Sequence, residues 1–247
     1  MLKFEQRSVC GLEVREASAI APLGGGRFVV VDDARGVYFV EDTGLAELIA
    51  SREDHRELRD LEGCCLAPNG DIWVLSERTS AIYALARDGD GLGEPSLVAE
   101  LKHIAKKSNK GWEGMTIRRA EAWPDQTARL VTVHEGKPRA VGVFDLATFD
   151  VESLLELPKA TKKVLADVSD LTVDPETDHL LLLSDESHSI AEVQLVYVDG
   201  GLRGLELLDV LELDVGKKEK PEGLCFDEDG ALWVVTDGDA HLRSFVR

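Results

Sequence analysis

One pattern recurs five times along the chain and constrains its fold more than any other feature. Each copy has a polar or acidic first residue, a short apolar run, a turn, a second apolar run and another acid. The copies span residues 18–33, 62–77, 113–135, 169–186 and 222–238. Aligned on Ser18, Glu62, Glu113, Asp170 and Glu222, successive copies start 44, 51, 57 and 52 residues apart. Repeats of this length are typical of propellers and solenoids.

Each repeat holds four short apolar runs bounded by turn residues, which predicts a blade of four antiparallel strands. In the second repeat these runs are GCCLA, DIWVLS, AIYALA and SLVAEL, and the turn PNGD (68–71) closes the first hairpin. The sequence therefore predicts an all-β fold, a five-bladed β-propeller that occupies residues 1–247 as a single domain. Six blades remain the alternative.

The two ends of the chain predict how the ring closes. The fifth repeat stops at Arg247 after HLRSFV, one strand short of a full blade, and the segment LKFEQRSV (2–9) precedes the first repeat with no blade of its own. Because an unpaired edge strand favours aggregation, we expect this N-terminal strand to complete the last blade.

Composition and charge exclude several classes of protein. A chain of 247 residues with 44% hydrophobic content can bury the core of one compact domain. We find no apolar run of membrane-spanning length and no secretory signal after Met1, so we expect a cytoplasmic protein with no membrane partner. The four cysteines lack metal-ligand spacing, so we expect buried thiols. The net charge of −19 argues against nucleic acid as a partner.

Acidic residues occupy equivalent positions in the repeats. In a propeller, the first strand of each blade begins near the central channel, on the face where the second strand ends. We therefore expect one end of the channel to be ringed by the first positions and by the ends of the second strands. These positions are Ser18, Glu62, Glu113, Asp170 and Glu222, followed by Asp33, Glu77, Glu135, Asp185 and Asp237.

So many carboxylates around one axis repel one another unless a cation neutralises them. Oxygen ligands without a His or Cys cluster favour Ca²⁺ over zinc and over Mg²⁺. The sequence thus predicts a Ca²⁺ site formed by eight residues: Glu62, Glu113, Asp170, Glu222, Glu77, Glu135, Asp185 and Asp237. The alternative is that the first-position acids accept hydrogen bonds from backbone amides of the neighbouring blade. Gly63, Gly114 and Gly223 suit a place where backbones crowd near the axis.

Basic residues gather in the loops assigned to the same face. An acidic centre inside a basic rim is the arrangement expected for an anionic small molecule bridged to the protein by a metal ion. The alternative is that these charged loops are only solvated. The predicted rim consists of Lys106, Lys107, Lys110, Lys137, Arg139, Lys162, Lys163, Lys217 and Lys218.

Four segments resemble the repeated signatures of the SdiA-regulated family of bacterial β-propellers. They are DLEG (60–63), KGWEGMTI (110–117), DVSDLTVDPETDHLLLLSDES (167–187) and PEGLCFDEDGALWVVTDG (221–238). This resemblance implies a propeller and adds little about activity. A looser similarity to phytase-like and lactonase-type propellers implies a Ca²⁺-dependent hydrolase of phosphate esters or lactones.

Three functions are compatible with the sequence: a metal-dependent hydrolase, a non-enzymatic binder of an anionic ligand, and a protein-interaction propeller with a structural cation. In a hydrolase, His134 is the best candidate for proton transfer, because it stands at the end of a second strand and its ordinary pKa is near neutrality. The alternative role of His134 is a hydrogen bond to a neighbouring carboxylate. We also expect an exposed Trp112 to contact a ligand, with core packing as the alternative.

Overall fold

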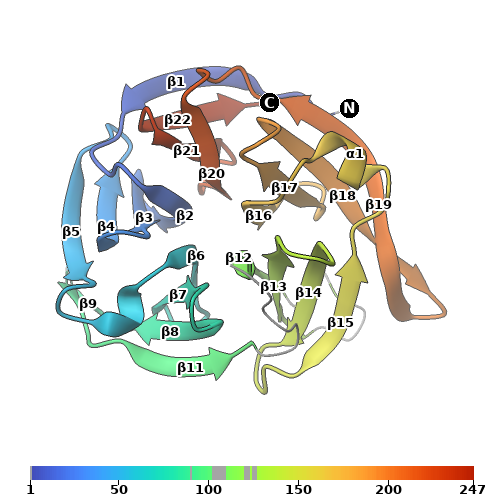
Figure 1. Cartoon of the computed structure of the whole chain (residues 1–247), viewed down its shortest axis with the longest axis horizontal. Coiled ribbons are helices and arrows are strands. Elements are labelled where there is room, and N and C mark those ends of the chain that lie inside the picture. The colour runs from blue at the N-terminus through green and yellow to red at the C-terminus, as the bar shows by residue number, and fades with distance from the viewer. Residues whose placement is uncertain (1, 90, 102–109, 120–122, 124–126) are drawn as a thin grey trace.

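A computed structural model describes residues 2–89, 91–101, 110–119, 123 and 127–247. The chain forms five four-stranded antiparallel sheets arranged as blades around a central axis (Figure 1). The predicted five-bladed β-propeller is confirmed. None of the described helices has the length or hydropathy that a membrane span requires.

The blades follow one another in chain order. Blade 1 contains β2 (Ala17–Gly24), β3 (Arg27–Asp32), β4 (Gly36–Glu41) and β5 (Ala46–Ser51). Blade 2 contains β6 (Leu61–Leu66), β7 (Ile72–Ser76), β8 (Ala81–Leu85) and β11 (Ser96–Glu100). Blade 3 contains β12 (Trp112–Arg118), β13 (Arg129–His134), β14 (Ala140–Asp145) and β15 (Val151–Glu156). Blade 4 contains β16 (Asp170–Val173), β17 (Leu180–Ser184), β18 (Ser189–Val198) and β19 (Gly201–Glu212).

Blade 5 combines the two ends of the chain, as the sequence predicts. It contains β20 (Glu219–Phe226), β21 (Leu232–Gly238), β22 (His241–Val246) and β1 (Glu5–Gly11). The N-terminal strand β1 pairs with β22, with Glu5 opposite Val246, and it forms the outer edge of this blade in Figure 1. Small elements in the connections are η1 (Arg56–Leu58), the hairpin β9 (Arg87–Asp88) and β10 (Gly91–Leu92), and α1 (Thr161–Val164).

The core lies between neighbouring blades. The described residues form five hydrophobic clusters, one at each interface between adjacent blades. Alternate side chains of a strand point to opposite faces of its sheet, so Leu180 and Leu182 of β17 pack toward blade 3, whereas Leu181 and Leu183 pack toward blade 5. This explains the unbroken LLLL run, because β17 is covered on both faces. Truncating such a leucine to alanine typically costs about 2–5 kcal/mol.

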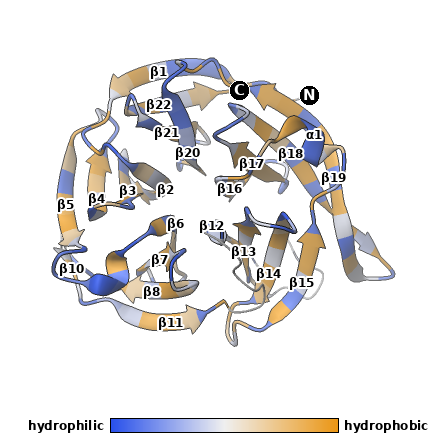
Figure 2. Cartoon of the chain, viewed as in Figure 1, coloured by the Kyte–Doolittle hydropathy of each residue, from blue (hydrophilic) through white to orange (hydrophobic). Residues whose placement is uncertain are grey.

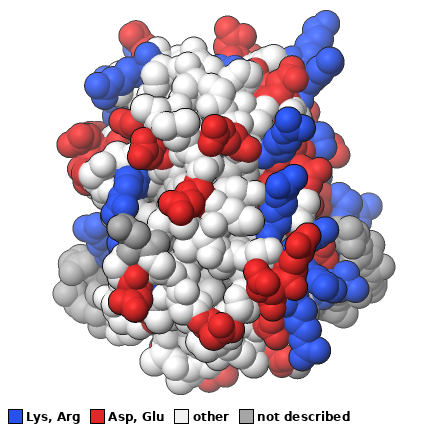
Figure 3. All heavy atoms as spheres, turned by 90° about the vertical axis from the view of Figure 1, so that its left-hand side faces the viewer, with Lys and Arg blue, Asp and Glu red and all other residues white. Residues whose placement is uncertain are grey.

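The outer surface is less uniform than the core. The ribbon of Figure 2 is mostly hydrophobic along the strands and hydrophilic in many of the connections. Figure 3 shows the side where β5 forms the edge of blade 1, a mostly uncharged surface that carries several Asp and Glu side chains, with Lys and Arg gathered toward its two flanks. Leu45 and Leu48 are exposed there.

Candidate functional site

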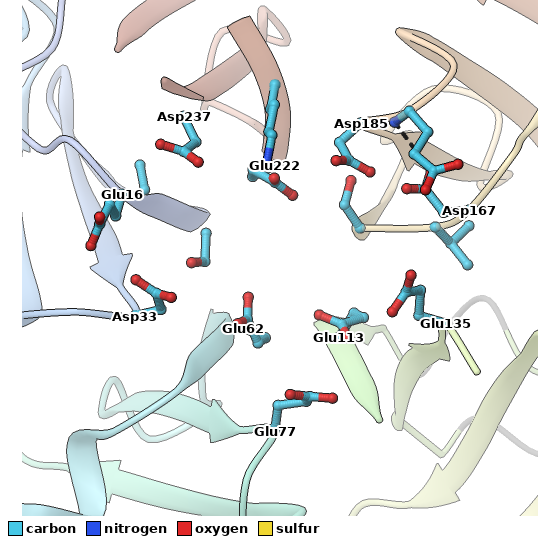
Figure 4. Close-up of a pocket in the computed structure, with 16 residues that line it drawn as sticks. Glu16, Asp33, Glu62, Glu77, Glu113, Glu135, Asp167, Asp185, Glu222 and Asp237 are labelled. Atoms are coloured by element: carbon cyan, nitrogen blue, oxygen red, sulfur yellow. Dashed lines mark hydrogen bonds between the residues drawn. The ribbon is translucent and has the colours of Figure 1, made fainter. Parts of the chain in front are cut away.

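A pocket of about 370 Å³ lies at the end of the channel where the inner strands begin, and we call it the channel pocket (Figure 4). Its lining contains eleven carboxylates, one lysine and no other charged side chain among the described residues. The carboxylates are Glu16, Asp33, Glu62, Glu77, Glu113, Glu135, Asp167, Asp185, Glu186, Glu222 and Asp237, and the lysine is Lys220. Seven of the eight predicted ligands therefore lie here, although their binding of a metal stays a prediction.

Local backbone geometry turns the first-position glutamates toward the axis. The ladder between the first two strands changes register at Glu62 in blade 2, near Glu113 in blade 3 and at Glu222 in blade 5. A β-bulge of this kind re-aims a side chain that would otherwise point into a blade interface. Figure 4 shows all three glutamates converging on the centre of the channel.

The structure does not place Asp170, the eighth predicted ligand, in the channel pocket. Its carboxyl group is buried and does not line the channel pocket. Oδ1 accepts a hydrogen bond from the backbone N–H of Leu171 at 2.7 Å, and Oδ2 accepts one from Leu224 in blade 5 at 2.8 Å. Asp170 thus has the backbone-bonding role that was the alternative for this residue.

The cause is a longer hairpin in blade 4. Six residues (174–179) separate the paired ends of β16 and β17, whereas five residues (67–71) separate those of β6 and β7. Counting fifteen residues back from Asp185, the spacing between Glu62 and Glu77, therefore stops at Asp170, one residue short of the true equivalent, Ser169. Ser169 is the residue that takes the glutamate's place and lines the pocket.

Glycines allow the close packing at the axis, as the sequence predicts. A Cβ atom on Gly114 would lie 1.7 Å from Oδ1 of Asp170, and a Cβ on Gly223 would lie 2.7 Å from the Cα of Ala19. Asp170 occupies the equivalent position in blade 4, because it pairs with Leu183 as Gly223 pairs with Val235. Its side chain thus packs between Gly114 of blade 3 and Leu224 of blade 5.

Crowding shifts the protonation of the central glutamates. Burial, with repulsion from Asp33 and Glu77, raises the pKa of Glu62 to about 8. Burial and repulsion from neighbouring carboxylates raise the pKa of Glu222 to about 9 and that of Glu113 well above its usual range. These groups are poised to ionise when a cation replaces their protons.

Two carboxyl groups in the channel pocket have oxygens without a partner among the described residues. Glu113 is only 9% exposed, and no hydrogen bond or ion pair to a described residue engages its side chain. Oδ1 of Asp33 is buried without a hydrogen-bond partner, and burial with repulsion from Glu16 and Asp32 raises the pKa of Asp33 to about 6. Leaving such acceptors unsatisfied is costly, so their oxygens are available to a ligand.

A second group of acids lies on the blade 4 side of the pocket. The pKa of Asp185 is raised to about 7 by burial and by its contact with Asp167. Ser184 donates a hydrogen bond from its hydroxyl to Asp167, which fixes that carboxylate at the wall (Figure 4).

The structure does not place His134 in the channel pocket. His134 is 3% exposed, and its Nδ1 lies 3.1 Å from the carbonyl oxygen of Pro138. Adjacent residues of a strand point to opposite sides, so Glu135 lines the pocket while His134 packs against Trp112. Burial lowers the pKa of His134. The prediction that it transfers a proton at this site is not supported by its position.

Trp112 is also buried, which corrects the expectation that it is exposed. It is 1% exposed, its Nε1 donates a hydrogen bond to the carbonyl of Leu101 at 2.8 Å, and its ring meets Phe144 edge-on. The alternative role, core packing between blades 2 and 3, is confirmed.

The predicted basic rim does not line the channel pocket among the residues described. Lys110 pairs with Glu135 of the pocket, and Lys162 pairs with Glu156. Arg139 donates to the carbonyl of Leu165 at 2.8 Å. Lys137, Lys163, Lys217 and Lys218 are exposed. Lys106 and Lys107 lie outside the described residues.

Sequence reasoning missed four charged lining residues: Glu16, Asp167, Glu186 and Lys220. Two of them had a signal in the sequence. Glu16 and Lys220 each precede the first position of their blade by two residues, and residues two apart on an extended strand face the same side. Asp167 has the same spacing only from Ser169, the first position that the structure gives to blade 4.

A family model matches this arrangement of repeats. The model, described as SdiA-regulated, matches residues 27–241. The chain belongs to the SdiA-regulated family. The family suspected from the sequence is thereby confirmed. No curated protein matches this member of the family in sequence.

Solved structures share the fold of this SdiA-regulated protein at low identity. A glutaminyl cyclase from Myxococcus xanthus has a TM-score of 0.62 and 9% identity, with 98% of this chain and 95% of that chain covered. A streptogramin B lyase has a TM-score of 0.57 and 10% identity, with 98% and 97% covered. A gluconolactonase from Xanthomonas campestris has a TM-score of 0.55 and 12% identity, with 96% and 88% covered. At these identities the likeness shows the fold alone.

Proposed function

We propose that this propeller binds a divalent cation, Ca²⁺, in the channel pocket. The observation that carries the proposal is Glu113, a nearly buried carboxylate that points into the pocket without a hydrogen bond or ion pair to any described residue. Glu62 and Glu222 lie beside it (Figure 4). Binding a cation would offset the mutual repulsion of these groups.

The donor set favours calcium over other metals. None of the described residues that line the channel pocket is His or Cys, the ligands that zinc prefers. Ca²⁺ takes about 6–8 oxygens in flexible geometry, whereas Mg²⁺ requires a stricter octahedron. A wide ring of carboxylates on five separate blades suits the more tolerant ion.

A hydrolase that acts on lactones or phosphate esters is the second candidate. A bound Ca²⁺ would polarise a carbonyl or phosphoryl oxygen in the pocket, and the gluconolactonase of X. campestris has the same fold. With one lysine among eleven carboxylates, an anionic ligand would depend on the cation for its binding. The non-enzymatic alternative is a propeller that binds the cation without turnover.

Thermal melting tests the cation site. Chelation by EDTA should lower the melting temperature, and added Ca²⁺ should raise it in proportion to RT ln(1 + [L]/Kd). Glu113→Gln should lose this response, whereas Glu47→Gln, an exposed carboxylate on β5, should keep it. A melting temperature that neither EDTA nor Ca²⁺ changes would overturn the proposal.

Assays with lactones and phosphate esters test the second candidate. A hydrolase should turn over one of these substrates with Ca²⁺, lose turnover with EDTA and lose it in Glu113→Gln. If Ca²⁺ stabilises the protein but none of the lactones or phosphate esters is turned over, the cation-binding function stands and hydrolysis of these substrates is excluded.

A further inference from the structure

A second pocket lies at the opposite end of the propeller channel, and we call it the opposite pocket. Its volume is about 650 Å³. All five inner strands contribute to it, through residues that include Ile20, Leu66, Ile117, Leu171 and Phe226. The close-packed layer around Asp170 and Gly114 separates it from the channel pocket.

The walls of the opposite pocket are apolar, unlike those of the channel pocket. Side chains of Ile, Leu, Val, Met, Phe, Pro and Cys supply most of its lining. Small-molecule sites are typically concave spaces of about 300–1,000 Å³ with apolar walls and a few polar groups that fix orientation. The opposite pocket meets this description.

The three carboxylates at this pocket are committed to other partners. Asp174 pairs with Arg247, and Asp178 pairs with Arg118. Asp227 accepts a hydrogen bond from Nε1 of Trp233 at 2.7 Å. These acids are therefore neutralised or satisfied within the fold, and they contribute little attraction for a cationic ligand.

Arg119 is the exception among the charged residues of the pocket. It is exposed at the rim, and within the described part of the chain no hydrogen bond or ion pair engages it. A guanidinium group stays charged and presents a fork of donors that matches a carboxylate. The opposite pocket thus offers apolar walls and one uncommitted cation.

We propose that the opposite pocket binds a small organic carboxylate with an apolar body. The body would lie against the apolar residues of the inner strands, and the carboxylate would pair with Arg119 at the rim. This site is independent of the cation site, because its lining shares no residue with the channel pocket.

Calorimetric titration of the whole chain with decanoate and with decanol tests the proposal, in EDTA so that the cation site plays no part. The parent should bind decanoate more tightly than decanol. Arg119→Gln should weaken decanoate binding by about 10- to 100-fold, the usual effect of removing a charged hydrogen-bond partner, and leave decanol binding unchanged. Arg87→Gln, an exposed arginine on β9, is the matched control and should bind both as the parent does.

A second variant tests the location of the apolar body. Leu66→Glu places a negative charge on the wall and should weaken both ligands, decanoate more strongly, while the melting temperature reports that the variant is folded. Failure of the parent to bind either compound overturns the proposal. Equal decanoate affinity in the parent and Arg119→Gln would also overturn it.

Discussion

The carboxyl group of Asp170 on β16 accepts a hydrogen bond from the backbone N–H of Leu224 on β20 at 2.8 Å. This bond joins blades 4 and 5 at the axis, and the same carboxyl group approaches Gly114 of blade 3. Three blades therefore meet at one buried acid, which lies between the two pockets. Its role is structural, and variants at this position should separate the stability of the ring from the binding of a cation.

Asp170→Ala should destabilise the protein without weakening the binding of Ca²⁺. The substitution leaves the amides of Leu171 and Leu224 without their acceptor, and each unsatisfied amide costs about 1–3 kcal/mol. Asp170→Asn should cost less, because its carbonyl oxygen retains one of the two bonds. Urea unfolding and calcium titration measure these effects. Loss of calcium affinity in Asp170→Asn would return Asp170 to the ligand set.

Gly114→Ala should destabilise the ring by at least about 1–3 kcal/mol, the usual cost of overpacking. The added Cβ would lie 1.7 Å from Oδ1 and 2.7 Å from Cα of Asp170, so backbone as well as side chain must move. Gly204→Ala is the matched control in a β-strand, since nothing lies within 4 Å of its added Cβ. Equal free energies of unfolding for the two variants would contradict close packing at the axis.

In EDTA, the free energy of unfolding should fall as the pH rises. The pKa is raised from 4.5 to about 8 for Glu62 and to about 9 for Glu222. At a pH between the pKa of the unfolded state and that of the folded state, the native protein holds more protons than the unfolded chain. The contribution of these glutamates to the free energy of unfolding is therefore complete below the unfolded pKa, and it is lost as the pH rises through the folded pKa. Each pH unit in this window costs about 1.4 kcal/mol for each fully shifted group.

Urea unfolding at a series of pH values measures this slope. Added Ca²⁺ should flatten it, because the cation favours the ionised carboxylates. Stability in EDTA that rises between about pH 5 and pH 8 would show that these acids are not crowded in the native state.

Deleting residues 1–9 should lower the melting temperature strongly and reduce solubility. The deletion removes most of β1, exposes the edge of β22 and takes the buried Leu2 and Phe4 from the interface of blades 4 and 5. It also removes Gln6, which accepts a hydrogen bond from Arg243 at 2.6 Å. Lys3→Ala, an exposed substitution in the same segment, should leave the melting temperature unchanged. An unchanged value for the deletion would contradict closure by β1.

The fold could be predicted from the sequence because each repeat encodes its own blade. Hairpin turns such as PNGD and the continuous apolar run of β17 specify strands that are covered on both faces. The missing fourth strand after HLRSFV also predicted the closure by the N-terminal segment. These signals are local, and the ring follows from repeating them.

The candidate site could be predicted only in part. The first position of each blade was found by counting back from the end of the second strand, which assumes hairpins of equal length. The hairpin of blade 4 has one additional residue, so the count selected Asp170 in place of Ser169. The direction of a long loop side chain is set by its partner, so the pairing of Lys110 with Glu135 could not be predicted from position alone. The burial of Trp112 likewise depends on contacts between blades.

Calorimetric titration of the EDTA-treated, dialysed protein with calcium chloride near neutral pH tests the cation site most directly. We predict saturable binding that releases protons, seen as a difference in heat between two buffers of unlike ionisation enthalpy, because protonated carboxyl groups such as Glu113 must ionise to bind the metal. Glu113→Gln should abolish the binding, and Glu47→Gln should retain it. The absence of any calcium binding by the parent protein would contradict the proposed function.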